Sequence, residues 1–269
     1  MNLAMSLADT LSLEQSLVVH LSPTMFNLVC VGGPVLLTLL AFAVMRRLVA
    51  CGVFKEHHDV ASAMFTTLGT VYGIFLAFIV ATTWQYYNTT ATNVSNEALY
   101  LGMLYGNARA YAPESGDALR KLLRDYRQTV VEKEWTMLAK GEQSSKAEHL
   151  MDEITNWYTS YQPRTKTEDA FFNESVHNLN MLKQLRDERI GDAASGLIPL
   201  LWVVLFAGAL ATIGFTFLFN AKNIWVQGIM IGLLTLVITL TLFAIVNLDF
   251  PFTGQVAISS DPFASLKMN

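Results

Sequence analysis

Charge is scarce in this sequence of 269 residues. Lys, Arg, Asp and Glu make up 15% of the chain, whereas 52% of the residues are hydrophobic. A soluble domain carries about 25% charged residues, so the imbalance excludes an ordinary soluble globule. The pI near 5.7 and the net charge of −4 also leave no basic surface of the kind that binds nucleic acid.

Cysteine and the short motifs of many enzymes are also scarce or missing. Cys30 and Cys51 would lie roughly 31 Å apart along one helix, too far for a disulfide, which excludes a disulfide-stabilised secreted scaffold. The sequence contains no P-loop, dinucleotide fingerprint, HExxH, CxxC or nucleophile elbow. His57 and His58 would point about 100° apart on a helix, so a polar loop is expected there. We therefore expect no enzyme activity, no cofactor and no metal site.

Charge is absent altogether from four apolar stretches. Each has about the 20 residues that a helix needs to cross a bilayer, and aromatic residues such as Trp84 and Trp225 lie near their ends, as in interfacial belts. The stretches are Met25–Met45, Met64–Tyr86, Leu197–Phe219 and Ile224–Asn247. We expect an all-α membrane protein with four transmembrane helices. The first is not expected to be a cleaved signal, because residues 1–45 contain no Lys or Arg.

Most of the charge lies in one segment between the second and third apolar stretches. Residues 97–192 contain 29 of the charged side chains. Helical periodicity indicates four helices here, separated by a turn at Pro113–Gly116, by Gly141 and by Pro163. They are Asn93–Tyr111, Asp117–Lys140, Ser144–Tyr161 and Glu168–Asp192. We expect a soluble helical-bundle insert, partly continuous with spans two and three.

The expected organisation has five parts. An N-terminal tail (1–24) precedes transmembrane helices 1 and 2 (25–86), the insert (87–195), transmembrane helices 3 and 4 (196–247) and a C-terminal tail (248–269). Pro-Phe turns in that tail are expected to anchor it against the insert, with a short helix beginning at Pro262.

The side of the membrane that the insert faces stays open. Arg46, Arg47, Lys55 and Lys222 favour placing the two short loops in the cytoplasm and the insert outside. Lys183, Arg186 and Arg189, close to the third span on the insert side, favour the opposite orientation.

Threonine and glycine are the notable residues of the membrane spans. Thr66, Thr70 and Ile74 share one face of span two at i, i+4 spacing, where they are candidate pore-lining residues in an oligomer, and an apolar ring there can gate by dewetting. Alternatively, the threonines bond only their own backbone. The helix-packing candidates are the pairs Gly69–Gly73 and Gly228–Gly232, which have the small-xxx-small spacing.

Glu97 has three possible roles. It can join a polar network with the acid–aromatic residues Tyr126, Glu134 and Trp135. It can instead form a ring of carboxylates at a pore mouth, favouring cations, or be an ordinary exposed acid.

Several segments resemble a bacterial membrane family of uncharacterised function that is described as bestrophin-like. They are GTVYGIFLAFIV (69–80), WQYYN (84–88), NEA (96–98), DYRQTVVEKEW (125–135), LIPLLW (197–202) and LDFPFTG (248–254). Span two is distantly similar to the neck-lining helix of bestrophin ion channels. The resemblance implies a pentamer whose neck-facing positions are Thr66, Thr70 and Ile74, with the insert and both termini in the cytoplasm.

The chain departs from bestrophins in two respects. Bestrophin necks are lined by bulky apolar residues, whereas two of the three positions here are threonine. No acidic calcium-binding run is found near the C-terminus.

The leading functional hypothesis is a homo-oligomeric channel for small inorganic ions in the bacterial inner membrane, with span two lining the pore. The alternative is a non-conducting membrane scaffold or sensor that acts through its helical insert.

Overall fold

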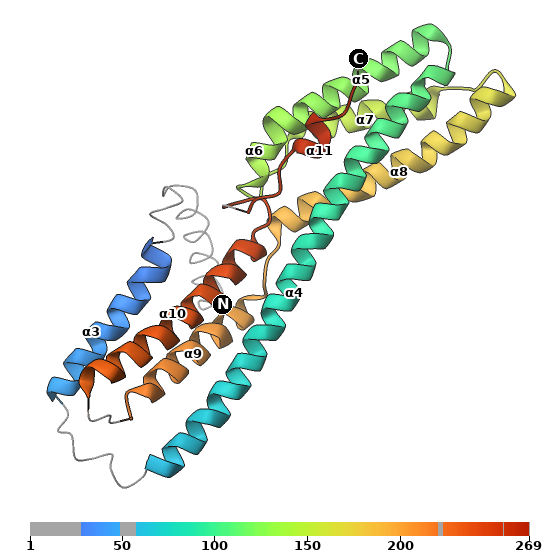
Figure 1. Cartoon of the computed structure of the whole chain (residues 1–269). Helices are drawn as coiled ribbons and strands as arrows, with labels where there is room; N and C mark the ends of the chain where they lie inside the picture. Colours follow the sequence, from blue (N-terminus) through green and yellow to red (C-terminus); the bar gives the residue numbers. More distant parts are fainter. Residues whose placement is uncertain (1–27, 49–57, 220–222, 255, 269) are drawn as a thin grey trace, which may run out of the picture. The chain divides into compact units, whose positions relative to one another are not determined.

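The computed structural model describes residues 28–48, 58–219, 223–254 and 256–268. The expected N-terminal tail lies outside these residues, as do Cys51, Lys55, His57 and Lys222. The described residues form helices joined by turns, with no strand among them (Figure 1). The chain divides into two compact units, Met1–Gln85 with Leu197–Asp249 and Tyr86–Gly196 with Phe250–Asn269. They are called the apolar unit and the polar unit below.

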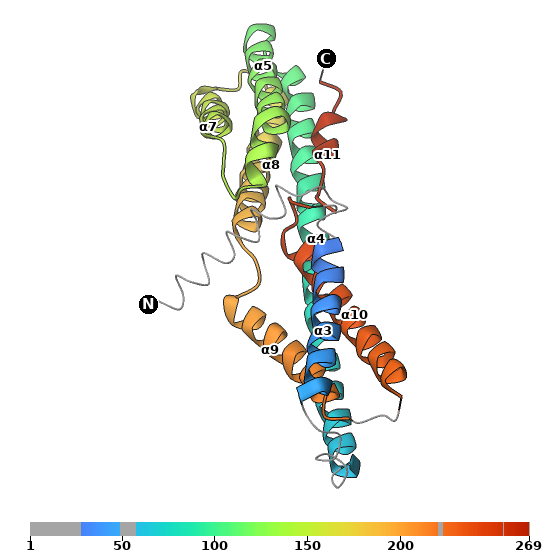
Figure 2. The ribbon, with the colours of Figure 1, turned by 90° about the vertical axis from the view of Figure 1, so that its left-hand side faces the viewer.

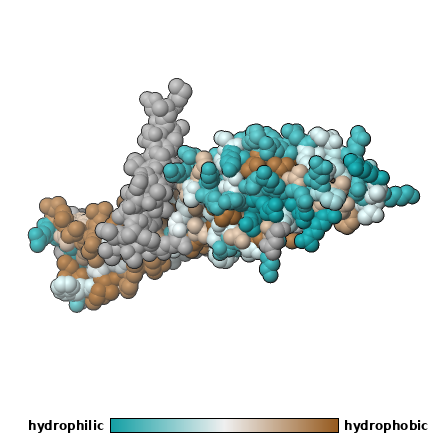
Figure 3. Space-filling model, turned by 90° about the horizontal axis from the view of Figure 1, so that it is seen from above, coloured by the Kyte–Doolittle hydropathy of each residue, from teal (hydrophilic) through white to brown (hydrophobic). Residues whose placement is uncertain are grey.

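The apolar unit contains the four long hydrophobic helices. A short π-helical segment, Leu28–Gly32, leads into α3 (Gly33–Leu48). The first part of α4 (His58–Asn107), α9 (Pro199–Thr216) and α10 (Ile224–Asp249) follow. Each of the four helical segments is long and apolar enough to cross a membrane, which confirms that prediction. Hydrophobic side chains gather over this unit and hydrophilic ones over the other (Figure 3).

A close contact between α4 and α9 organises the core of the apolar unit. Tyr72 of α4 is buried, and its hydroxyl donates to the Leu205 carbonyl oxygen at 2.8 Å. A Cβ atom at Gly208 would overlap the Tyr72 ring, so only glycine permits this approach. Trp202 is buried in the same core, and its ring stacks on that of Phe206 with the ring centroids 5.6 Å apart.

Helix α4 is a single helix of 50 residues. The sequence from Ile74 to Leu101 contains no proline or glycine, and therefore nothing in it breaks the helix at the expected end of span two. The predicted continuity with span three is wrong. Helix α8 (Lys166–Ala194) ends before α9, and Ile198 is extended with ψ 133° because it precedes Pro199.

The polar unit begins with the second part of α4 and the 3-10 turn η2 (Ala108–Ala110). It continues with α5 (Pro113–Thr129), the π-helical segment η3 (Val130–Glu134), α6 (Trp135–Leu138), α7 (Ser145–Ser160) and α8, with α7 packed beside α5 (Figure 2). The expected turn at Pro113–Gly116 is wrong, since these residues form the first turn of α5 with proline at its start. Gly141, with φ +69°, follows the end of α6 as predicted. The Ser144 side chain then caps α7.

The C-terminal tail completes the core of the polar unit. Phe252, Ile258 and Phe263 are buried in that core, and the Trp135 indole donates to the Ile258 carbonyl oxygen at 3.0 Å. The short helix α11 (Asp261–Ala264) has Pro262 in its first turn. Both the anchoring of the tail and its short helix are therefore confirmed.

Candidate functional site

One face of α4 carries the three candidate pore-lining residues. Thr66, Thr70 and Ile74 are all exposed, Ile74 by 67%, so α4 presents them together on one side of the helix. The Thr66 hydroxyl donates to the Ser62 carbonyl oxygen at 2.9 Å, as the backbone-bonded alternative predicts. Cβ atoms at Gly69 and Gly73 would have nothing within 4 Å, so these two glycines do not pack against another helix of the chain's described part.

The exposed face continues along α4 for about ten turns. The exposed positions recur every three or four residues, which is the helical repeat, while Leu76, Ile79 and Val94 on the other side are buried. The exposed positions that share the face are Thr66, Thr70, Gly73, Ile74, Ala77, Ala81, Gln85, Asn88, Thr92, Ser95, Leu99 and Met103. We call them the α4 stripe. Leu99 and Met103 belong to the polar unit and are nevertheless 51% and 40% exposed.

The second glycine pair lies where α10 meets α3. A Cβ atom at Gly228 would come within 3.9 Å of Phe42, and one at Gly232 within 3.7 Å of Leu39. Both are ordinary van der Waals distances, so a Cβ atom would fit at either position. Close packing therefore does not require glycine here, and the missing side chains leave empty space between the two helices.

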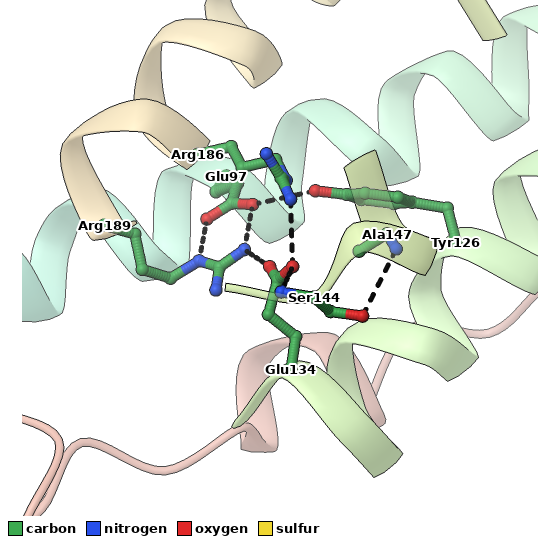
Figure 4. Close-up of polar contacts among 7 residues, drawn as sticks. All are labelled: Glu97, Tyr126, Glu134, Ser144, Ala147, Arg186 and Arg189. Atoms are coloured by element: carbon green, nitrogen blue, oxygen red, sulfur yellow. Dashed lines mark hydrogen bonds and ion pairs between the residues drawn. The ribbon is translucent and has the colours of Figure 1, made fainter. Parts of the chain in front are cut away.

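Glu97 lies in a buried ion-pair network of the polar unit (Figure 4). Both of its carboxylate oxygens accept from Arg189, from Nε at 2.6 Å and from Nη2 at 3.0 Å. Arg189 Nη2 also donates to Glu134 at 2.8 Å, and Arg186 donates to the other oxygen of Glu134 at 2.9 Å. The Tyr126 hydroxyl donates to Glu97 at 3.2 Å. The network therefore joins α4, α5, η3 and α8, and its two carboxylates balance its two guanidinium groups.

The surroundings of Arg189 hold it in the charged form. The guanidinium is fully buried and lies 5.3 Å from the centre of the Trp135 ring and 5.9 Å from that of Phe263, close enough for cation–π attraction. Burial lowers the pKa of Arg189, but the charge and hydrogen bonds of Glu97, with Tyr126 and Glu134, raise that pKa above its ordinary value. Burial, together with the Glu97 charge, raises the pKa of Tyr126 well above 10.0.

This geometry gives Glu97 a structural role. Its side chain is 0% exposed, and both oxygens are engaged, so the carboxylate is not presented to a hydrated ion in this chain. The expected ring of carboxylates at a pore mouth does not match this placement, nor does an exposed surface acid. Of the expectations for Glu97, the polar network with Tyr126 and Glu134 is confirmed.

Sequence reasoning missed Arg186 and Arg189 as the cationic half of the network. A signal was present in their register. Leu179 and Leu182 are buried on the same face of α8, and the two arginines continue it at the next helical repeats. A charged residue at such a core position requires an opposite charge from a neighbouring element. Among the described residues, no group of three or more His, Cys, Asp or Glu side chains lies close enough to hold a metal ion.

The fold defines a multi-pass α-helical membrane protein. Comparison with known families matches residues 32–263 to the Bestrophin-like domain, and the chain belongs to the bestrophin-like family. Neither the curated proteins nor the solved structures contain a match to it.

Proposed function

We propose that this protein is a homo-oligomeric channel for small inorganic ions, in which copies of α4 surround a common pore. The observation that carries the proposal is the α4 stripe, which leaves one side of the longest helix exposed in a membrane protein of the bestrophin-like family. Most of the stripe consists of threonine, glycine, alanine and other small or polar residues, which suit contact with other copies or with water in a pore better than contact with lipid tails.

The pore-facing residues are Thr66, Thr70 and Ile74. The Ile74 side chains of the copies form an apolar ring, which can close the pore by dewetting. One turn away, the smaller Thr70 side chains form a second ring. Because Thr66 donates its hydroxyl proton to Ser62, its ring offers an ion only the acceptor side of the hydroxyl oxygen.

The polar unit stands outside the bilayer in this proposal, since it contains most of the charge. Its exposed Leu99 and Met103 then supply an apolar contact between neighbouring copies of α4. Thiol labelling of Lys146→Cys in a Cys30→Ser, Cys51→Ser background reports which side the unit faces. Lys146 is exposed, whereas Ser144, two residues earlier, is buried and caps α7.

Single-channel recording of the purified full chain in planar bilayers tests conduction. We expect currents that a charged thiol reagent blocks after Thr70→Cys in the cysteine-free background. Leu210→Cys is the matched control, because Leu210 is 75% exposed but lies on α9; the reagent is expected to leave its current unchanged.

Absence of conductance, together with a monomer in detergent, would refute the proposal. A non-conducting scaffold or sensor makes a different prediction: the phenotype is insensitive to Ile74→Ala and is lost when the exposed surface of α5 is altered.

A further inference from the structure

An apolar groove separates α3 from α10 in the apolar unit. It measures about 600 Å³ and is lined by aliphatic and aromatic side chains and by Gly228 and Gly232. The two glycines leave the groove open because the side chains that would fill it are missing, and their nearest neighbours across it are Phe42 and Leu39.

The length of the groove matches half of a bilayer. Its lining runs along α10 from Ile224 to Leu236, which is about 18 Å at ~1.5 Å per residue. The hydrocarbon core of a bilayer is about 30 Å thick, so the groove spans about one leaflet. An acyl chain has this reach, whereas a transmembrane helix from a second copy would need a groove through both leaflets.

One end of the groove is cationic. Arg46 follows Phe42 by one turn of α3, its guanidinium lies 5.9 Å from the centre of the Phe42 ring, and it donates to the Gln227 side chain at 2.8 Å. Arg47 is exposed beside it. Trp225, 79% exposed, lies at the same end of α10, as an interfacial aromatic residue does. The groove therefore begins at positive charge near an interface and continues into apolar surface.

We propose that this groove binds an anionic phospholipid, with one acyl chain lying along Phe42, Gly228 and Gly232 and the phosphate against Arg46 and Arg47. Charge complementarity selects the headgroup, since a juxtamembrane arginine contributes attraction to anionic lipid. The apolar lining and one-leaflet length select the chain. This site is independent of the proposed conduction.

Native mass spectrometry of the full chain in detergent measures the site directly, with phosphatidylglycerol and phosphatidylcholine of identical acyl chains as probes. We expect phosphatidylglycerol to bind more tightly than phosphatidylcholine. Arg47→Gln is expected to weaken the binding of phosphatidylglycerol about fivefold, because each arginine contributes about 1 kcal/mol. The binding of phosphatidylcholine is expected to stay unchanged. Arg47→Lys restores the preference.

Gly232→Leu fills the groove and is expected to weaken the binding of both lipids about tenfold, because displacing as few as two methylenes of the acyl chain has that effect. Gly214→Leu on α9 is the matched control, since a Cβ atom at Gly214 has nothing within 4 Å and Gly214 lies outside the groove. If Gly232→Leu does not fold, the Arg47 variants alone test the proposal, because Arg47 is exposed and its substitution does not disturb the packing.

Three results overturn the proposal. The first is equal binding of the two lipids to the unaltered protein, and the second is equal effects of Gly232→Leu and Gly214→Leu. The third is loss of the oligomer with unchanged lipid binding in Gly232→Leu, which assigns the groove to a second copy.

Discussion

Removing one charge from the buried network is expected to destabilise the polar unit strongly. The four ionised groups Glu97, Glu134, Arg186 and Arg189 sum to zero net charge, and the side chains of Glu97, Glu134 and Arg189 are 0% exposed. Glu97→Gln keeps the shape but leaves one uncompensated positive charge in the core. Breaking a buried pair from one side costs about 3–5 kcal/mol.

Thermal unfolding of the full chain in detergent, followed by helical circular dichroism, measures the loss. At about 4 °C per kcal/mol, the value between those of smaller and larger domains, Glu97→Gln is expected to lower Tm of the polar unit by about 12–20 °C. Asp117→Asn is the matched control, because the Asp117–Arg120 pair lies at the surface, with the Asp117 side chain 64% exposed. Asp117→Asn is expected to lower the free energy of unfolding by no more than about 0.5 kcal/mol.

A double variant identifies the charge balance as the cause. Glu97→Gln with Arg189→Met removes one charge of each sign and leaves the Glu134–Arg186 pair at 2.9 Å. The stability lost in the double variant is expected to be smaller than the sum of the losses in the two single variants by about 1–3 kcal/mol. Strict additivity, or a Glu97→Gln variant as stable as Asp117→Asn, would refute the reasoning.

Three further outcomes are expected. Gly208→Val should lower Tm of the apolar unit, since its Cβ overlaps the Tyr72 ring, whereas Gly214→Val should not; equal Tm values for the two variants would contradict the close contact. The pKa of Tyr126 is raised in the folded chain, so stability falls as pH rises above 10. Tyr126→Phe should remove about 1.4 kcal/mol per pH unit of that slope in alkaline unfolding curves. Leu99→Cys in the cysteine-free background should form disulfide-linked dimers, and Lys121→Cys on α5 should not; equal cross-linking would argue against packing along α4.

The fold was more predictable than the network. Long uncharged runs sufficed to place the four apolar helices, because a bilayer imposes length and composition on each helix separately. Gly141 and Pro262 marked helix boundaries through backbone geometry that is local to them. The contact of Tyr72 with Gly208 was not predictable from GxxxG spacing, because the partner of a glycine depends on which helices become neighbours. Glu97 shows the same limit, since its role depends on arginines about 90 residues away.

The burial of Glu97 changes what the proposed pore can select. The proposed pore-facing residues Thr66, Thr70 and Ile74 are uncharged, as is the rest of the α4 stripe, so the pore has no fixed charge on this helix face to exclude ions of one sign. Such a pore is expected to discriminate weakly between cations and anions, and its conductance should stay constant between about pH 5 and pH 9, since no stripe residue titrates there. Reversal potentials under a salt gradient measure the discrimination. A strongly cation-selective current that Glu97→Gln abolishes, in protein whose Tm is unchanged, would return this carboxylate to the pore and contradict its assignment to the buried network.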